Sequence, residues 1–368
     1  MPTFCRHNRF LANCPICSGD QVEVVSNRRT SPAKPARSTP PRPRSGSSAT
    51  RGGRAGGLRV RQIAREQEDG FRSTLIPGVK ASAAAERLAD ELAFAVARLE
   101  LLAAAPPGLY ADVAAAPAAA SATGQPAAAA AGSAAFASQP AGAVAQPPAA
   151  PAQPAAREEA LWLAFLIAYL GPLDGEDPFA GVRAAHTSWA SGALSALDDV
   201  PLGPRTAHDP ARGTDTLVAY RAWAERAGSQ DAAFAGEASW APERRFARAY
   251  ERLALPGLHR DARFDLLVAI GQLGLHELCA DALQLGGADE TTIAAKRVFG
   301  IADTLLLERR AHELAEAAEL PLAALDLALW NWNRPPRPGG ERDRATLGTP
   351  DVEPDADAYA RVAAALGL

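Results

Sequence analysis

The chain has 368 residues, a formal net charge of −4, and long stretches dominated by Ala, Pro, Gly and Ser. Three of its four cysteines fall within the first 17 residues, which excludes a disulfide framework for a chain of this length. Its most apolar run, residues 160–170, is about half of the roughly 20 residues that a membrane-spanning helix needs, and no signal peptide opens the sequence, so we expect a cytoplasmic protein without a membrane partner.

Charge is distributed unevenly along the chain. Residues 1–80 carry fifteen Lys/Arg against five Asp/Glu, a net charge of +10. Residues 81–368 carry twenty-three against thirty-seven, a net charge of −14. This asymmetry indicates that the basic residues 1–80 bind an anion such as nucleic acid, whereas the acidic residues 81–368 do not bind one over a broad surface. Association with the nucleoid therefore stays open beside the cytoplasmic assignment.

Residues 1–20 contain the segment CRHNRFLANCPIC, with the spacing C-x-H-x6-C-x2-C, and its C-x2-C half is typical of a zinc knuckle. Thiolates and imidazole are preferred zinc ligands, and binding would fold a segment too short to fold by burial alone. Four protein ligands leave no open position for a catalytic water, so the predicted Zn²⁺ is structural. The alternative is a redox pair or a chance cluster, although no strand-helix context surrounds the C-x-x-C. The predicted ligands are Cys5, His7, Cys14 and Cys17.

Residues 21–57 are expected to form a disordered basic linker. Within it, residues 27–57 carry eight Lys/Arg and no acid, and contain almost nothing to bury. With the zinc knuckle, the basic residues in 27–65 are the predicted contact with DNA. The alternative is a solubilising spacer, because basic runs alone are weak signals of binding.

Residues 58–104 read as a short β-hairpin followed by an amphipathic helix. The EDG sequence favours a tight turn, with Gly70 supplying the positive φ. From residue 82 to 104, leucines and a valine recur at three- and four-residue steps, and Ser82 is a candidate N-cap. Residues 105–156 are an Ala/Pro-rich stretch that we expect to be a disordered tether.

Residues 157–333 show helical periodicity throughout and no strand-like alternation, which predicts an all-α, multi-helix bundle. Residues 334–368 are expected to form a loop and a closing helix over 355–368. The helices of the bundle are predicted at 157–170, 178–197, 214–227, 241–254, 261–273, 275–285, 290–299, 303–319 and 321–333.

The stretch LALPGLHRDARFDLLVAIG resembles the helix-hairpin-helix of DNA glycosylases, in which a Leu-Pro-Gly-apolar-Gly turn offers backbone N–H groups to a phosphate. Residues 255–258 match this turn, whereas His259 stands where the second glycine is expected. An ordinary turn before a helix is the alternative. In those glycosylases a catalytic Asp follows the hairpin, and Asp281 lies at a comparable distance; a solvated helical Asp is the other interpretation.

Several segments of the chain resemble the α-glutamyl/putrescinyl thymine pyrophosphorylase family, clade 3. They are residues 294–333 and 165–179, the opening CxHNR and CPIC elements, and the EDGFRS and RLADEL segments. This resemblance implies an all-α fold related to helix-hairpin-helix DNA glycosylases. It also implies a role in making hypermodified thymine in DNA, by displacing diphosphate from a modified thymine with an amine. The alternative is a zinc-bearing DNA-binding or interaction scaffold without catalytic activity.

A pyrophosphorylase needs cations or helix N-termini that stabilise the departing diphosphate. Lys296, Arg297 and Arg310 are the candidate cations, with Arg309 beside them, and Asp303 could orient one of them or hold a metal. For each cation, a solvated helix face is the alternative. Asp326 shares a helical stripe with Trp330 and Asn333, and could line a pocket or accept a structural hydrogen bond from a neighbouring helix.

Overall fold

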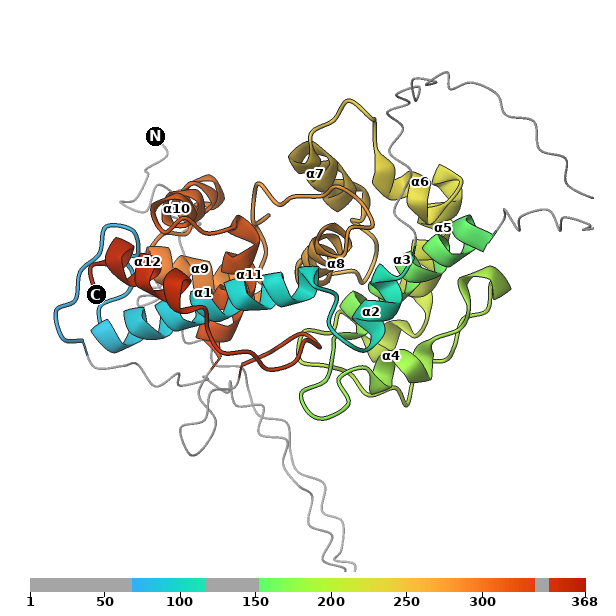
Figure 1. The fold of residues 1–368 in the computed structure, drawn as a ribbon, viewed down its shortest axis with the longest axis horizontal. Helices are drawn as coiled ribbons and strands as arrows, with labels where there is room; N and C mark the ends of the chain where they lie inside the picture. The colour runs from blue at the N-terminus through green and yellow to red at the C-terminus, as the bar shows by residue number, and fades with distance from the viewer. Residues whose placement is uncertain (1–67, 117–151, 335–343) are drawn as a thin grey trace, which may run out of the picture. The chain divides into compact units, whose positions relative to one another are not determined.

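The computed structural model describes residues 68–116, 152–334 and 344–368, all of which belong to one unit (Figure 1). The predicted zinc knuckle and basic linker, and most of the Ala/Pro-rich tether, lie outside these residues. The all-α prediction is confirmed for the described part of the chain, which contains no strand. Its α-helices are α1 (Ser82–Ala103), α2 (Leu109–Ala114), α3 (Ala152–Leu170), α4 (Ala180–Ala185), α5 (Asp215–Ala227), α6 (Gln230–Ala235), α7 (Pro242–Arg252), α8 (Arg260–Gln272), α9 (Glu290–Phe299), α10 (Thr304–Ala317), α11 (Leu322–Asn333) and α12 (Ala356–Leu366).

The predicted β-hairpin is wrong for the described residues of that segment, since residues 68–81 form turns without strand pairing. The carboxylate of Asp69 accepts the backbone N–H groups of Phe71 and Ser82, each at 3.0 Å. These bonds fold the segment back onto the start of α1, so its backbone is satisfied by a side chain rather than by a ladder. Gly70 has the predicted positive φ, at 90°. Ala81 rather than Ser82 occupies the N-cap position of α1.

Helix α1 is part of the helical body despite the low-complexity stretch that follows it in the sequence. Its leucines at 88, 92 and 99 are buried, and the helix packs against α11, α12 and α8. The indole Nε1 of Trp332 on α11 donates to the carbonyl of Ala84 at 3.0 Å. Figure 1 shows α12 and α11 lying along α1. The predicted amphipathic helix therefore finds its partner in the C-terminal helices.

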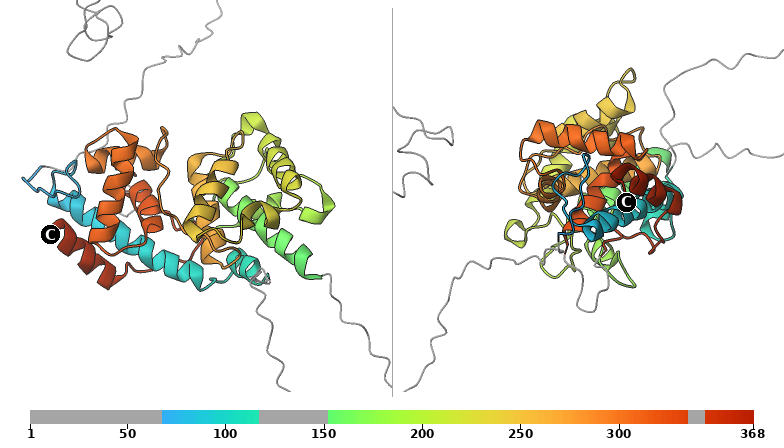
Figure 2. Two further views of the ribbon diagram at one scale, coloured as in Figure 1. Left: turned by 90° about the horizontal axis from the view of Figure 1, so that it is seen from above. Right: turned by 90° about the vertical axis from the view of Figure 1, so that its left-hand side faces the viewer.

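Helix α3 organises the other helices of the body through contacts with α2, α4, α6 and α8. Its aromatic side chains Trp162 and Phe165 stack on one another and on Tyr220 of α5. Figure 2 shows, in its left view, α1 running beside both this set of helices and the set formed by α9 to α12. Among the described residues, no helix is long and apolar enough to cross a membrane.

The predicted helix over 178–197 is too long. Helix α4 ends at Ala185, and only a short 3-10 turn (Trp189–Ser191) follows it. The carboxylate of Glu159 on α3 explains the change, because it accepts the backbone N–H of Trp189 at 2.8 Å and binds His186 Nε2 at 2.6 Å. Contacts from α3 thus replace the hydrogen bonds that a continued helix would have made.

The predicted helix over 275–285 does not form, and the segment is irregular up to α9. Side chains from three other elements satisfy its backbone. Glu308 accepts the N–H groups of Leu283 and Leu285, at 2.8 and 2.5 Å. Arg157 and Arg260 donate to the carbonyls of Leu275 and Leu283. Tertiary hydrogen bonds therefore replace a helix that the local pattern alone favoured.

Candidate functional site

A pocket of about 490 Å³ opens where two helix N-termini meet an irregular loop. Residues 259–262 at the start of α8 and residues 287–290 at the start of α9 form two of its walls. The loop 204–207 and Trp330 of α11 complete the lining. The loop is held in place by α3, since Gly203 N donates to Leu170 O at 3.1 Å and Ala207 N to Tyr169 O at 2.8 Å.

The two helices differ in how their N-termini are capped. Asp289 caps α9, its carboxylate accepting the N–H of Thr292 at 2.8 Å. Helix α8 begins after His259, an exposed residue in extended conformation whose side chain makes no capping hydrogen bond. The first turn of α8 therefore presents backbone donors and the positive end of the helix dipole to the pocket without a side-chain acceptor of its own.

Two buried arginines stand at this end of the pocket. Arg205 donates through Nε and Nη2 to the two oxygens of Asp265, and Nη2 also donates to Asp326 Oδ2 at 2.7 Å. Arg260 donates from Nη1 to the other oxygen of Asp326 and to Asp261 Oδ1, the latter at 2.9 Å. Asp326 thus sits between two guanidiniums, which ties α11 to α8 and to the 204–207 loop.

One nitrogen atom of each arginine makes no hydrogen bond within the described residues. Arg205 Nη1 and Arg260 Nε are buried and have no hydrogen-bond partner within the described residues. The side chain of Arg205 is only 1% exposed, and its guanidinium lies 5.3 Å from the ring centroid of Trp330. A buried donor without a partner is energetically unfavourable, and the protein itself encloses both of these nitrogen atoms.

The electrostatics of this network keep both guanidiniums charged. Burial opposes the charged form of Arg205, but Asp265 and Asp326 outweigh it and raise its pKa. The pKa of Arg260 is raised in the same way, with Asp326 and Asp261 outweighing burial. Burial raises the pKa of Asp265 to about 6, against the opposing effect of Arg205. The carboxyl therefore takes up a proton more readily than an exposed aspartate.

Three carboxylates also line the pocket, those of Asp261, Asp289 and Glu290. Asp289 is engaged as the α9 cap, and Glu290 accepts Asn333 Nδ2 at 2.6 Å. Asp261 has a side chain that is 17% exposed and is paired with Arg260. The pocket accordingly combines guanidiniums and helix donors for an anion with carboxylates for an amine.

Two of the predicted catalytic cations belong to α9 and reach the edge of this pocket. Lys296 Nζ lies 3.5 Å from the carbonyl of Gly287, one of the lining residues. Arg297 donates to Asn333 Oδ1, and the same Asn333 donates to Glu290 of the pocket wall. Lys296 therefore lies beside the site, and Arg297 is linked to the pocket wall through Asn333.

The other predicted residues have different positions. Asp326 is 1% exposed and contacts the pocket through Arg205 and Arg260 rather than lining it. Asp303 caps α10 by accepting the N–H of Leu306 at 3.0 Å. Arg310 pairs with Glu313 at 2.8 Å, as Arg309 does at 2.9 Å. The contacts of Asp303 and Arg310 thus serve α10, and the structure does not bring them to the pocket.

The Leu-Pro-Gly-Leu turn joins α7 to α8 as the hairpin interpretation requires. Gly257 has φ +80°, and a Cβ there would lie 2.3 Å from Thr216 Oγ1 and 3.0 Å from Arg212 Cδ. Close packing against α5 and its preceding turn therefore accounts for this glycine without a phosphate. Asp281, the aspartate considered after the hairpin, is exposed in the irregular segment. The aspartates that line the pocket are Asp261 and Asp289.

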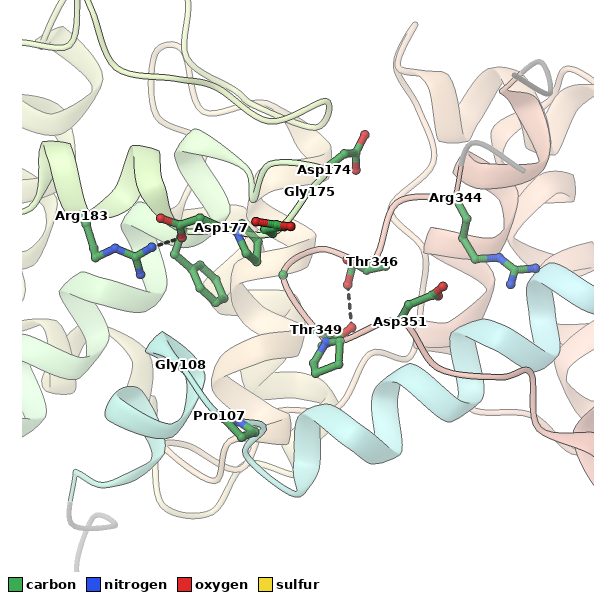
Figure 3. Close-up of a pocket in the computed structure, with 15 residues that line it drawn as sticks. Pro107, Gly108, Asp174, Gly175, Asp177, Arg183, Arg344, Thr346, Thr349 and Asp351 are labelled. Atoms are coloured by element: carbon green, nitrogen blue, oxygen red, sulfur yellow. Dashed lines mark hydrogen bonds and ion pairs between the residues drawn. The ribbon is translucent and has the colours of Figure 1, made fainter. Parts of the chain in front are cut away.

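A second pocket, of about 790 Å³, lies between the loops at 174–179 and 346–351 and has a different chemistry (Figure 3). Asp174, Glu176, Asp177 and Asp351 line it. Its two arginines are occupied: Arg183 pairs with Asp177, and Arg344 pairs with Asp90 and Glu91 of α1. The smaller pocket is the better candidate for a phosphorylated ligand, because the N-terminus of α8, which has no side-chain cap, opens into it.

Sequence reasoning missed Arg205, Arg260 and Asp261, although the latter two adjoin the Leu-Pro-Gly turn. An Arg in the first turn of a helix that lacks a capping side chain is a usable signal for an anion site, whereas an Asp in the same turn opposes one. No comparable signal marks Arg205, which lies in a Pro/Gly-rich loop without periodicity.

The predicted zinc ligands Cys5, His7, Cys14 and Cys17 lie outside the described residues. Within those residues, no group of three or more His, Cys, Asp or Glu side chains is arranged to hold a metal ion.

Comparison with protein-family models, with curated proteins and with solved structures finds no match to this chain.

Proposed function

We propose that this protein modifies a thymine base in DNA, displacing diphosphate from a phosphorylated hydroxymethyl group with an amine, and that its active site is the pocket at the N-terminus of α8. The observation that carries the proposal is the meeting of this N-terminus, which has no side-chain cap, with two buried arginines and three carboxylates in one pocket.

The leaving diphosphate is assigned to the α8 end of the pocket. Backbone N–H groups of the first helical turn are assigned as the donors to phosphate oxygens, and the guanidiniums of Arg205 and Arg260 supply positive charge behind them. Lys296, whose ammonium lies beside Gly287, adds a third cation at the rim. Because the buried network fixes both arginines before substrate arrives, their positive charge acts on the leaving group from a fixed position.

The amine is assigned to the carboxylate side of the same pocket. In the reaction, the amine nitrogen forms a C–N bond to the methylene carbon while the C–O bond to the diphosphate breaks. The bonding electron pair leaves with the diphosphate oxygen, and the proton lost by the amine passes to Asp261. Of the three carboxylates, Asp261 is the one that neither caps α9 nor binds Asn333. Asp326 acts as a positioning residue, because it holds the two arginines rather than contacting substrate.

Delivery to DNA is assigned to the N-terminal part of the chain. In this proposal Cys5, His7, Cys14 and Cys17 bind one structural Zn²⁺, and the basic residues in 27–65 lie along the phosphates. This part of the proposal rests on the sequence alone. It places the enzyme on its polymeric substrate in the nucleoid.

The test uses the purified full chain, a DNA duplex carrying a diphosphorylated 5-hydroxymethyl group on one thymine, and putrescine as the amine. We expect release of diphosphate and a base heavier by the attached amine, detected by mass spectrometry. Asp261→Asn should slow the reaction by about 10²-fold or more, the range for loss of a general base. Asp357→Asn, at an exposed position on α12, is the matched control and should react as the wild type does. Wild-type protein that releases no diphosphate from this duplex would overturn the proposal.

A non-catalytic scaffold is the second candidate, and one observation favours it. Asp303, Arg310 and Asp326 all have structural partners, in a helix cap, a surface ion pair and a buried ion-pair network. If the protein is a non-catalytic scaffold, we expect its pocket to bind neither diphosphate nor amine. Isothermal titration of the full chain with inorganic pyrophosphate separates the two candidates, since the enzyme requires binding that Arg260→Gln weakens.

A further inference from the structure

Helix α7 presents a stripe of arginines on its exposed side. Arg244, Arg248 and Arg252 follow one another at four-residue spacing and are exposed. Residues four apart in an α-helix lie on one face, about 6 Å from each other along the axis. The opposite side of α7 is anchored by Phe246 and Tyr250, which are buried. The stripe is therefore held in a fixed orientation by the packing beneath it.

An indole lies along this stripe. The guanidinium of Arg244 is 4.8 Å from the ring centroid of Trp240, and that of Arg252 is 6.0 Å from it. Cation–π contacts of this kind orient a guanidinium while leaving its N–H groups available in the plane. The arginine face is defined here as Arg244, Arg248 and Arg252 with Trp240.

The charges of the arginine face are largely available. Arg244 and Arg252 have no carboxylate within 4 Å among the described residues. Arg248 pairs with Glu251 at 2.7 Å, but both side chains are more than half exposed. Such a pair contributes little and opens readily. Arg245, on the flank of the same helix, is instead engaged with Glu277 at 2.7 Å.

Nucleic-acid phosphates fit this surface better than a lipid bilayer does. An interfacial membrane helix buries a broad apolar face among the acyl chains. The exposed large apolar side chains of the described residues are Val218, Ile293, Leu305, Leu306 and Leu368, none of which belongs to α7. Regularly spaced guanidiniums beside an aromatic ring are suited to a row of phosphates.

We propose that the arginine face of α7 binds the phosphate backbone of duplex DNA without regard to sequence. The choice of DNA as the polymer rests on the proposed function, but the face would bind independently of any chemistry in the pocket. It would also give the acidic body its own contact with DNA, in addition to the basic segment over 27–65. Helix α7 continues through one short turn into α8, whose first residues line the pocket.

The test measures binding of the full chain to a fluorescein-labelled, unmodified 20-base-pair duplex over a range of salt concentrations. The variant replaces the three arginines, Arg244→Gln, Arg248→Gln and Arg252→Gln. A control removes the same charge elsewhere on the surface, with Arg72→Gln, Lys80→Gln and Arg183→Gln. For three lost phosphate contacts, the slope of log K against log salt should become shallower by about 2.7. Affinity at low salt should fall at least tenfold more than in the control, with the circular dichroism spectrum unchanged.

Two outcomes would overturn the proposal. In one, the arginine variant loses no more affinity than the charge-matched control. In the other, it loses binding to vesicles of phosphatidylglycerol and phosphatidylcholine while DNA binding stays the same, which would make the partner a lipid surface. Failure of the proposed reaction is distinguishable. A wild type that releases no diphosphate, while the arginine variant still weakens binding to the unmodified duplex, would overturn the proposed reaction and leave the arginine face as the DNA contact.

Discussion

Arg205 meets Asp265 edge to edge, with Nε donating to one carboxylate oxygen at 3.0 Å and Nη2 to the other at 3.1 Å. The Asp265 side chain is 18% exposed, and burial raises its pKa from 3.8 to about 6. The folded state therefore holds a proton on Asp265 at a pH where the unfolded chain has released it. Stability contributed by this proton is present at low pH and is lost as the pH rises from about 4 to about 6.

Asp265→Asn should remove this pH dependence. Two pKa units correspond to about 3 kcal/mol, so the stability of the wild type relative to the variant should fall by up to about that amount between pH 4 and pH 7. Urea unfolding at both pH values measures the difference, and using the difference cancels the other titrating groups. A relative stability that rises with pH would mean that pairing with Arg205 outweighs burial and holds the pKa of Asp265 low.

Removal of Asp326 should be among the most damaging changes in the described part of the chain. Asp326→Ala leaves Arg205 and Arg260 buried without the carboxylate that both contact. Breaking a buried pair in this way is expected to lower the free energy of unfolding by about 3–5 kcal/mol. Glu316→Ala, at an exposed position on α10, is the control and should change it by less than about 0.5 kcal/mol. If the two changes have equal effects in urea unfolding, Asp326 does not hold α11 to α8 through the buried arginines.

The helices that sequence periodicity predicted well are those whose own apolar stripes are buried. Helix α9 spans the predicted residues 290–299, and α5, α8 and α11 begin or end within one residue of the prediction. Among the predicted helices, the errors fall on 178–197 and 275–285, where carboxylates and guanidiniums from distant elements bind the backbone. Such bonds are absent from local sequence patterns. The same reason hides Arg205, which reaches the site because α3 holds its loop.

Gly78 should tolerate no side chain, because it lies against the C-terminal end of α9. Its N–H donates to Val298 O at 2.9 Å, and a Cβ would lie 1.9 Å from the carbonyl oxygen of Arg297. Gly78→Ala must therefore push the segment off α9, with an expected loss of about 1–3 kcal/mol in urea unfolding. Gly286→Ala is the control, since a Cβ there meets no atom within 4 Å. If both variants unfold at the same urea concentration, the segment before α1 is not held as described.

The predicted zinc knuckle can be tested with the fourth cysteine as its control. The purified full chain should contain about one zinc per molecule by elemental analysis, because the four predicted ligands complete a tetrahedral site. Cys14→Ser should lose the metal, since removal of one thiolate lowers affinity and leaves the short segment without its source of folding energy. Cys279→Ser should keep it, because Cys279 is an exposed free thiol between α8 and α9. A metal-free wild type whose N-terminal thiols are joined to one another would rule out the knuckle and leave the basic residues as the only predicted N-terminal contact with DNA.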